Sequence, residues 1–215
     1  MDRTLFVYRH CPFCIKAWMI FGLKKLPVTV VTLLNDDEAT PIGMIGRKVV
    51  PILEEDGRFM GESMDIVRHV DALDAPVLTG AVNPAVAAWI AGVSGVLYRQ
   101  ALPRIAMAPL PEFATTGARA YFTRNKESHD LPFGAVLAGD AEALAVLQAA
   151  LDALEPLIQD PAAVNGDLST DDIHLFAALH SLSIVAGLTY PATVEAYRRT
   201  MARRCGVALM DTLAA

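Results

Sequence analysis

The stretch Arg9-His10-Cys11-Pro12-Phe13-Cys14-Ile15-Lys16-Ala17 decides how the first third of this chain folds. It follows a short apolar run at 4–8, which predicts a strand, and leads into residues 13–23, whose composition predicts a helix. Cys11 therefore stands where the strand ends and the helix begins. Unpaired backbone N–H groups and the positive end of the helix dipole favour a thiolate there, which lowers the pKa and makes the sulfur nucleophilic. Pro12 fits the first helical turn, because the amide hydrogen it lacks would have no partner there.

The second thiol, Cys14, lies one helical turn after Cys11 and is placed to attack a mixed disulfide formed on it. A structural zinc fits less well, because zinc needs four ligands. The chain has three cysteines, the third being the distant Cys205, and adding His10 still leaves no compact second ligand pair. A structural disulfide across so short a loop would stabilise little and be easily reduced. A redox-active dithiol is therefore favoured over zinc, a structural disulfide or mere packing, and no metal is expected.

The composition of the 215 residues is that of a folded protein, with 53% hydrophobic residues and a net charge of −6. The negative charge and the lack of a basic run argue against a nucleic-acid partner. Three cysteines and an N-terminus without a long apolar leader predict a reducing, cytoplasmic setting. The longest uncharged stretch, 81–98, is interrupted by Asn83, Pro84 and glycines, so no membrane span is predicted.

The other elements of the first third follow from periodicity and turn residues. They are a strand at 28–34, a short helix at 38–45, a hairpin of strands at 49–54 and 58–60 around Glu55-Asp56-Gly57, and a helix from Ser63 to 73. The resulting order, β-α-β-α-β-β-α, is that of a thioredoxin-like domain. It places Cys11 at the C-terminal end of the first strand, where open α/β sheets usually bind ligands.

The sequence predicts two domains, 1–73 and 84–215, joined by a linker at 74–83 that is rich in proline, glycine and polar residues. The second domain is rich in alanine and leucine and lacks strand patterning, which predicts an all-α fold. Its helices are expected near 84–107, 115–127, 140–159, 169–186 and 190–204.

Three further positions in the chain have a local interpretation. In Leu168-Ser169-Thr170-Asp171-Asp172-Ile173, the Ser169 and Asp172 side chains fit a capping box, which we interpret as a stability device and not as a catalytic site. His10 either tunes the adjacent thiol or is a solvent-facing loop histidine. Tyr98 falls on an apolar helical position, which predicts packing in the core or between the domains, or a place on a cleft between them.

Three dipeptides in the first domain are candidates for ligand contacts. In Val50-Pro51 the proline opens a strand, and from the residues alone its peptide bond is expected to be trans. In Glu62-Ser63 the serine is a natural N-cap at a helix end that also attracts anions, although simple capping is the alternative. Arg47-Lys48 would by default be two solvated cations.

Together, Cys-Pro-Phe-Cys with the following Lys-Ala, the Val-Pro pair and Glu-Ser before a helix resemble the glutaredoxin and glutathione-transferase superfamily. The resemblance covers the whole chain and is closest to the large two-domain bacterial glutaredoxins. It is also carried by Met19-Ile20-Phe21-Gly22-Leu23-Lys24, Leu33-Leu34-Asn35-Asp36-Asp37, Glu62-Ser63-Met64-Asp65-Ile66-Val67 and Val164-Asn165-Gly166. It implies a glutathione-transferase-like architecture: an α+β thioredoxin-like N-terminal domain followed by an all-α C-terminal domain.

The resemblance also implies roles for individual residues. Cys11 would be the nucleophile and Cys14 the resolving thiol. The residues implied in glutathione binding are Phe13 through its ring, Val50 through its backbone after a cis Pro51, Glu62 for the γ-glutamyl ammonium, Ser63 for the γ-glutamyl carboxylate, and Lys48, ranked above Arg47, for the glycyl carboxylate. Phe13 departs from the commonest motif, which has tyrosine, so a role that needs a phenol hydroxyl is not expected.

The implied function is that of a glutathione-dependent thiol–disulfide oxidoreductase that reduces protein–glutathione mixed disulfides and protein disulfides. Glutathione would be the reducing co-substrate, glutathione reductase would recycle it, and the protein would be a monomer. One alternative is a glutathione transferase, which needs a residue, typically Tyr or Ser, that stabilises the thiolate of glutathione without reacting with it. Another is a non-enzymatic binding or regulatory protein on the same fold, which would not need two exchangeable sulfurs.

Overall fold

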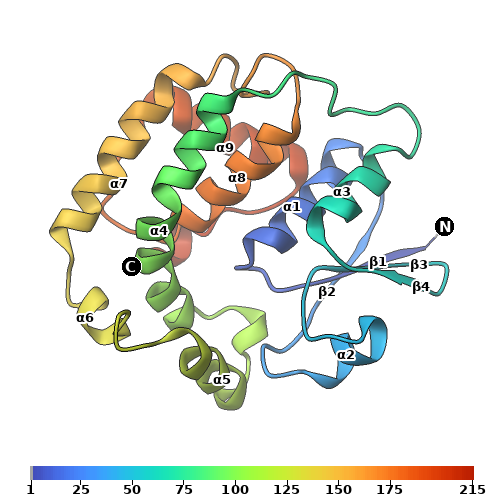
Figure 1. The fold of residues 1–215 in the computed structure, drawn as a ribbon, viewed down its shortest axis with the longest axis horizontal. Helices are drawn as coiled ribbons and strands as arrows, with labels where there is room; N and C mark the ends of the chain where they lie inside the picture. The colour runs from blue at the N-terminus through green and yellow to red at the C-terminus, as the bar shows by residue number, and fades with distance from the viewer. Residues whose placement is uncertain (1) are drawn as a thin grey trace.

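The computed structural model describes residues 2–215 and shows a sheet-containing region beside a helical one (Figure 1). The first region runs through β1 (Arg3–Val7), α1 (Pro12–Leu23), β2 (Thr29–Thr32), α2 (Ala39–Ile45), β3 (Ile52–Glu55), β4 (Arg58–Met60) and α3 (Ser63–Asp71). This is the predicted order of strands and helices, and the predicted fold class is confirmed.

The four strands form one mixed sheet in the order β2-β1-β3-β4. β1 pairs with β2 in parallel and with β3 in antiparallel orientation, and β3 continues into β4 as a hairpin. Helices α1 and α3 pack together on one face, and α2 lies on the other (Figure 1). Because β1 is an inner strand, its C-terminal end brings Cys11 to the middle of one edge of the sheet.

Two element boundaries near the candidate ligand residues differ from the prediction. β3 begins at Ile52 and not at residue 49, because an irregular segment precedes it in which the Val50–Pro51 peptide bond is cis. The trans bond expected from the residues alone is thus wrong, and the cis bond implied by the resemblance is present. α3 begins at Ser63, so the N-cap is Glu62, whose φ of 64° lies in the left-handed region, and not Ser63 as predicted.

The second region contains six α-helices within residues 2–215: α4 (Pro84–Met107), α5 (Thr116–Lys126), α6 (Phe133–Leu137), α7 (Ala141–Leu154), α8 (Thr170–Leu182) and α9 (Ala192–Cys205). Three short 3₁₀ turns accompany them: η1 (Pro111–Phe113), η2 (Glu155–Leu157) and η3 (Asp211–Leu213). The sequence did not predict α6. It also extended the fourth helix to 186, whereas α8 ends at Leu182 because the Ser183 hydroxyl donates to the His180 carbonyl at 2.6 Å and accepts from Met210 N at 2.8 Å.

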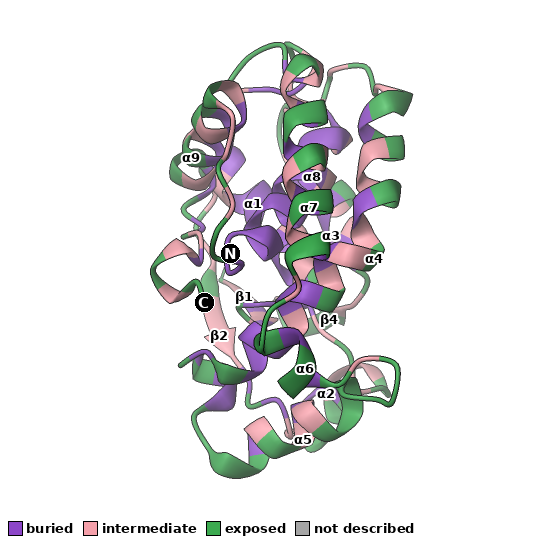
Figure 2. Cartoon of the chain, turned by 90° about the vertical axis from the view of Figure 1, so that its left-hand side faces the viewer, coloured by how far each residue is buried: buried purple, intermediate pink, exposed green. Residues whose placement is uncertain are grey.

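The core runs across both regions without interruption. Helix α8 is buried at eleven of its positions and packs against α4, α9 and α1, as the purple centre of Figure 2 shows. Helix α1 lies between α3 on one side and α8 and α9 on the other, which explains why it is apolar all round rather than amphipathic.

The start of α8 carries the predicted capping box. The Asp172 carboxylate accepts from Ser169 N at 2.9 Å, and the Ser169 hydroxyl accepts from Asp171 N at 3.3 Å. The same carboxylate also accepts from Val164 N at 2.8 Å and from the Tyr197 hydroxyl at 2.9 Å. All its bonds are therefore structural, as expected.

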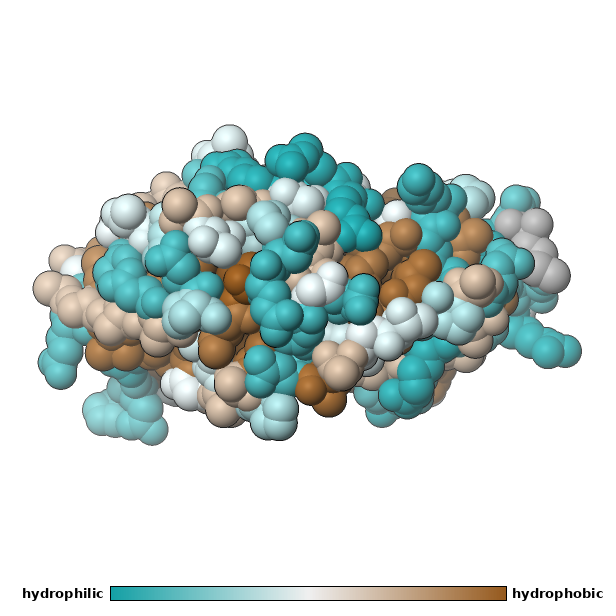
Figure 3. All heavy atoms as spheres, turned by 90° about the horizontal axis from the view of Figure 1, so that it is seen from above, coloured by the Kyte–Doolittle hydropathy of each residue, from teal (hydrophilic) through white to brown (hydrophobic). Residues whose placement is uncertain are grey.

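By length and composition alone, α4 is long and apolar enough to cross a membrane. In the fold 33% of its apolar 18-residue window is buried, and α4 packs against α6, α7 and α8, with the Trp89 indole donating to the Ala150 carbonyl at 2.6 Å. The surface seen from above in Figure 3 is mostly hydrophilic, with hydrophobic residues in separate patches between the polar ones.

Candidate functional site

Cys11 is the N-cap of α1, with φ −76° and ψ 118°, and Pro12 occupies the first helical position. The Cys11 amide donates to the Tyr8 carbonyl at 3.2 Å, and the Cys11 carbonyl accepts from Ile15 N at 3.0 Å. The Cys11 side chain is thus fixed at the positive end of the helix, where backbone N–H groups remain free to stabilise a thiolate. Cys14 is buried one turn later, and its sulfur accepts from Tyr8 N at 3.4 Å.

The pKa values of the two thiols are shifted in opposite directions. A hydrogen bond from the Cys14 thiol, the charge of His10 and backbone N–H groups outweigh burial and lower the pKa of Cys11 to about 6. Burial, together with the adjacent Cys11, raises the pKa of Cys14 well above its usual value. At neutral pH Cys11 is therefore the thiolate, and Cys14 holds the proton that stabilises it.

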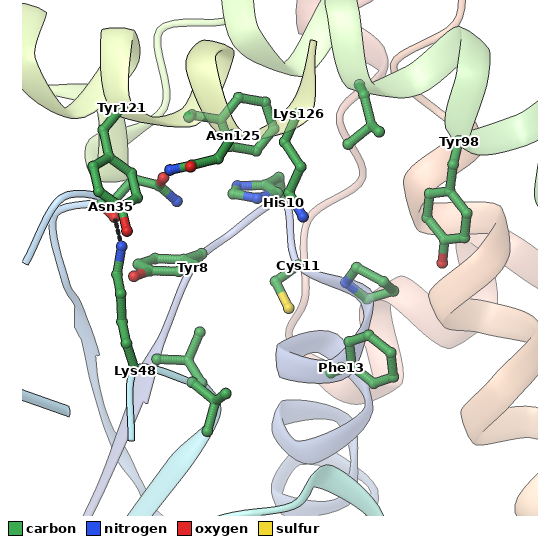
Figure 4. Close-up of a pocket in the computed structure, with 15 residues that line it drawn as sticks. Tyr8, His10, Cys11, Phe13, Asn35, Lys48, Tyr98, Tyr121, Asn125 and Lys126 are labelled. Carbon is green, nitrogen blue, oxygen red and sulfur yellow. Dashed lines mark hydrogen bonds between the residues drawn. The ribbon is translucent and has the colours of Figure 1, made fainter. Parts of the chain in front are cut away.

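A cleft of about 540 Å³ opens above Cys11 between the two regions. Figure 4 shows the Cys11 sulfur near its centre, with Tyr98 of α4 on one side and Tyr121, Asn125 and Lys126 of α5 above it. Tyr98 thus takes the cleft position that was one of its predicted alternatives. Because its hydroxyl is buried and faces the charge of Cys11, its pKa is raised.

A smaller hollow of about 200 Å³ adjoins the cleft. It is lined by five of the predicted glutathione-binding residues, Phe13, Val50, Pro51, Glu62 and Ser63, and by their neighbour Val49. The Phe13 ring is 54% exposed, with the Lys16 ammonium 5.1 Å from its centroid.

The two candidate cations occupy different environments. Lys48 lines the cleft, where its ammonium donates to the Asn35 carbonyl at 2.7 Å (the dashed line in Figure 4) and lies 3.5 Å from the Tyr121 ring centroid. Burial lowers the pKa of Lys48. Arg47 is exposed and bonds the Glu62 carboxylate at 2.6 Å. Of these two candidate cations, Lys48 is therefore the one that faces the cleft.

Sequence reasoning missed several residues of the cleft. Two of them could have been predicted from the sequence. Tyr8 comes directly after β1, at the end of the strand where ligands usually bind, and Asn35 belongs to a stretch that carried the resemblance. The α5 residues Tyr121, Asn125 and Lys126 could not, because they reach the cleft only through the packing of the helical region.

His10 does not face solvent, which rules out one of its two predicted alternatives. Its side chain is buried, and Nδ1 lies 2.6 Å from the Glu112 carboxylate of η1. As for metals, no group of three or more His, Cys, Asp or Glu side chains that could hold an ion occurs among residues 2–215, and the three cysteines are free.

Comparison with known proteins gives consistent relationships for both regions. Residues 85–214 match the family of the glutaredoxin 2 C-terminal domain, and residues 5–77 match that of the glutathione S-transferase N-terminal domain. The chain is 46% identical to glutaredoxin 2 of Escherichia coli (strain K12) over 212 residues, which is 98% of this chain and 99% of that protein.

Two solved structures resemble this chain, one at high and one at low sequence identity. A crystal structure of glutaredoxin 2 from Salmonella typhimurium in complex with glutathione has a TM-score of 0.97 and 48% identity, covering 100% of this chain and 99% of that one. Glutathione transferase Omega 3C from Trametes versicolor has a TM-score of 0.57 at 18% identity, covering 95% of this chain and 86% of that one, which shows a shared fold alone.

Proposed function

The chain belongs to the glutaredoxin 2 family, and we propose on that premise that it is a glutathione-dependent thiol–disulfide oxidoreductase. The observation that carries the proposal is the Cys11 sulfur at a helix N-terminus, with its pKa lowered to about 6, facing the cleft with Cys14 beside it. A glutathione complex of a relative 48% identical to this chain supports glutathione as the co-substrate.

In the proposed reaction the Cys11 thiolate attacks the glutathione sulfur of a protein–glutathione mixed disulfide. The disulfide bond between the glutathione sulfur and the protein sulfur breaks, and the protein thiolate leaves and takes up a proton. The thiolate of a second glutathione then attacks the mixed disulfide on Cys11, which releases glutathione disulfide and restores the Cys11 thiolate.

For a protein disulfide, Cys11 attacks one of its sulfurs and forms a mixed disulfide with the protein, while the other protein sulfur leaves as a thiolate. Cys14 then loses its proton and attacks the Cys11 sulfur, which releases the second protein thiolate and leaves a Cys11–Cys14 bond. Two glutathione molecules reduce that bond and form glutathione disulfide.

The hollow and the cleft together suggest how glutathione would lie. Glu62 and Ser63 at the start of α3 would hold the γ-glutamyl end, with the carboxylate on the free N–H groups of the helix. The backbone of Val50 would pair with the peptide, since it lies outside the β3 ladder, and the Phe13 ring would pack on it. Lys48 would bind the glycyl carboxylate.

The residue at the nucleophile position argues against a glutathione transferase. Conjugation needs a group that stabilises the thiolate of glutathione without reacting with it, whereas a thiolate at Cys11 forms a mixed disulfide. The buried proton donor at Cys14 likewise argues against a purely structural role, because a scaffold gains nothing from a lowered pKa at Cys11.

The proposal extends to the surroundings of the protein. Its substrates would be glutathionylated or disulfide-bonded proteins, with glutathione reductase regenerating glutathione. We also propose that it works as a monomer in the cytoplasm, where a reducing glutathione pool sustains the cycle, and that its domains are 1–73 and 84–215 with a linker between them.

The decisive experiment is turnover of a glutathione mixed disulfide, coupled to glutathione and glutathione reductase. Cys11→Ser is expected to abolish turnover, whereas Cys14→Ser keeps deglutathionylation and loses reduction of protein disulfides. Equal loss of deglutathionylation in both variants would contradict the one-thiol route. An electrophile-conjugation assay run beside it would reveal a transferase if conjugation were the faster reaction.

A further inference from the structure

A buried carboxylate of the helical region lies directly behind the active-site loop. Glu112 is 0% exposed. Its Oε1 accepts from the backbone N–H of His10 at 3.0 Å and lies 2.6 Å from Nδ1 of the same residue. One carboxylate oxygen therefore fixes both the backbone and the ring of the residue that precedes Cys11.

A buried carboxylate is costly unless it has a cationic or hydrogen-bonding partner. Burial, the largest influence on Glu112, opposes ionisation, yet the hydrogen bond and charge of His10 lower its pKa below the usual range. Its second oxygen, Oε2, is buried without a hydrogen-bond partner within residues 2–215, so the side chain depends on His10. This is the arrangement expected of an ionised carboxylate that accepts from both the backbone N–H and the ring of one residue.

The surroundings of the His10 ring keep it in place. Tyr8 and Phe113 stack on it with ring centroids at 5.8 Å and 5.4 Å, and Phe122 meets it edge-on at 5.2 Å. The titratable groups that face it from the packed elements are Glu112 of η1, Tyr8 at the end of β1, Cys11, Lys126 of α5, which shares the cleft, and His180 of α8. Glu112 is the carboxylate among them and carries the bond to the ring.

We propose that Glu112 is a positioning residue, which fixes the ring and the backbone N–H of His10 beside Cys11 and thereby supports the thiolate at Cys11. The inference rests on the proposed function and adds that the helical region contributes to the reactivity of the catalytic thiol. The influence on the two sulfurs is opposite. The charge of His10 lowers the pKa of Cys11, whereas the charge of Glu112 contributes to raising that of Cys14.

The test is the rate of Cys11 alkylation by iodoacetamide from pH 4 to pH 9, followed at Cys11 by mass spectrometry in the reduced protein. Glu112→Gln keeps the shape but removes the charge. Its rate at pH 6 is expected to fall about three- to tenfold, while the rate at pH 9 stays unchanged because the thiolate is then fully formed. Glu112→Asp is expected to recover part of the loss.

Two further variants keep the proposal open to refutation. His10→Gln, which removes the imidazole and leaves Glu112 in place, is expected to lower the rate at pH 6 in the same way, even if Glu112→Gln fails to fold. Glu142→Gln, an exposed acid-to-amide change on α7, is the control and is expected to match the unaltered protein.

A folded Glu112→Gln protein with an unaltered pH profile would overturn the proposal, as would an unaltered profile in His10→Gln. Because alkylation needs no glutathione, the result is independent of whether the protein turns over glutathione mixed disulfides.

Discussion

At the scale of single residues, the acidity of Cys11 depends first on its neighbour Cys14. The hydrogen bond from the Cys14 thiol is the largest of the influences that lower the pKa of Cys11 to about 6. Alkylation of Cys11 should therefore be half-maximal near pH 6, with the thiolate forming as the pH rises. Buried Cys14, whose pKa is raised, should stay unreactive at neutral pH.

Removing this donor gives a residue-scale prediction. Cys14→Ala is expected to slow Cys11 alkylation at pH 6 by about tenfold, whereas Cys14→Ser retains an O–H donor and slows it less. Cys205→Ser is the matched control, because Cys205 is buried at the end of α9 against Gly22 of α1 and does not line the cleft. Equal rates for Cys14→Ala and the unaltered protein at pH 6 would show that another group stabilises the thiolate.

The neighbouring cations allow a second prediction. Lys48→Met is expected to raise the KM for glutathione about tenfold with little change in kcat, because a partly buried ammonium that binds a carboxylate acts in ground state and transition state alike. Arg47→Met serves as the comparison and should change KM less than threefold, since Arg47 is exposed and already paired with Glu62. A larger effect at Arg47 would reverse the assignment.

At the scale of elements, α1 and α9 approach so closely that only glycine fits at position 22. A Cβ on Gly22 would lie 2.1 Å from the Cys205 carbonyl oxygen, which is backbone and unable to move aside alone. Gly22→Ala is expected to lower the free energy of unfolding by about 3 kcal/mol, measured by urea titration. Gly43→Ala in α2 is the control, because a Cβ there meets nothing within 4 Å, and it should be neutral or slightly stabilising. Similar stabilities of the two variants would contradict the close packing.

Some of the helices and strands could be predicted from the sequence, and others could not. The strands and α1 were predictable because their apolar runs are bounded by Pro27 and Gly57, and the capping box marked Ser169 as the N-cap of α8. The five-residue helix α6 was not, since a single turn between loops has no periodicity to detect.

The residues of the candidate site likewise fall into those that the sequence could predict and those that it could not. Cys11 and Cys14 were identifiable from their spacing and their place between a strand and a helix, whereas the roles of Phe13 and the Glu62-Ser63 pair came from the resemblance to the superfamily. Glu112 and Tyr121 lie about a hundred residues away from His10 and Cys11 along the chain, and nothing in their own neighbourhoods marks them. Their roles arise from the docking of the helical region on the first one, which no local pattern encodes.

At the scale of the whole molecule, the two regions share one core. Helix α1 belongs to the sheet region by connectivity, yet it packs against α8 and α9 as well as α3. Separating the regions would expose the face of α1 that contacts α8, together with the buried Glu112–His10 pair. The free energy of that exposure makes independent opening of either region unfavourable.

We therefore expect a single cooperative unfolding transition in urea, and the two tryptophans allow it to be tested. Trp18 of α1 borders a hollow lined by Leu110 and Met210 at the junction of the regions, whereas Trp89 of α4 is bonded to α7. In Trp89→Phe the remaining fluorescence reports the junction, and in Trp18→Phe it reports the helical bundle. Within each variant, the fluorescence midpoint should coincide with that of circular dichroism at 222 nm. If Trp18 fluorescence changed at lower urea than the helical signal, the regions would separate before they unfold, and the shared core would not govern stability.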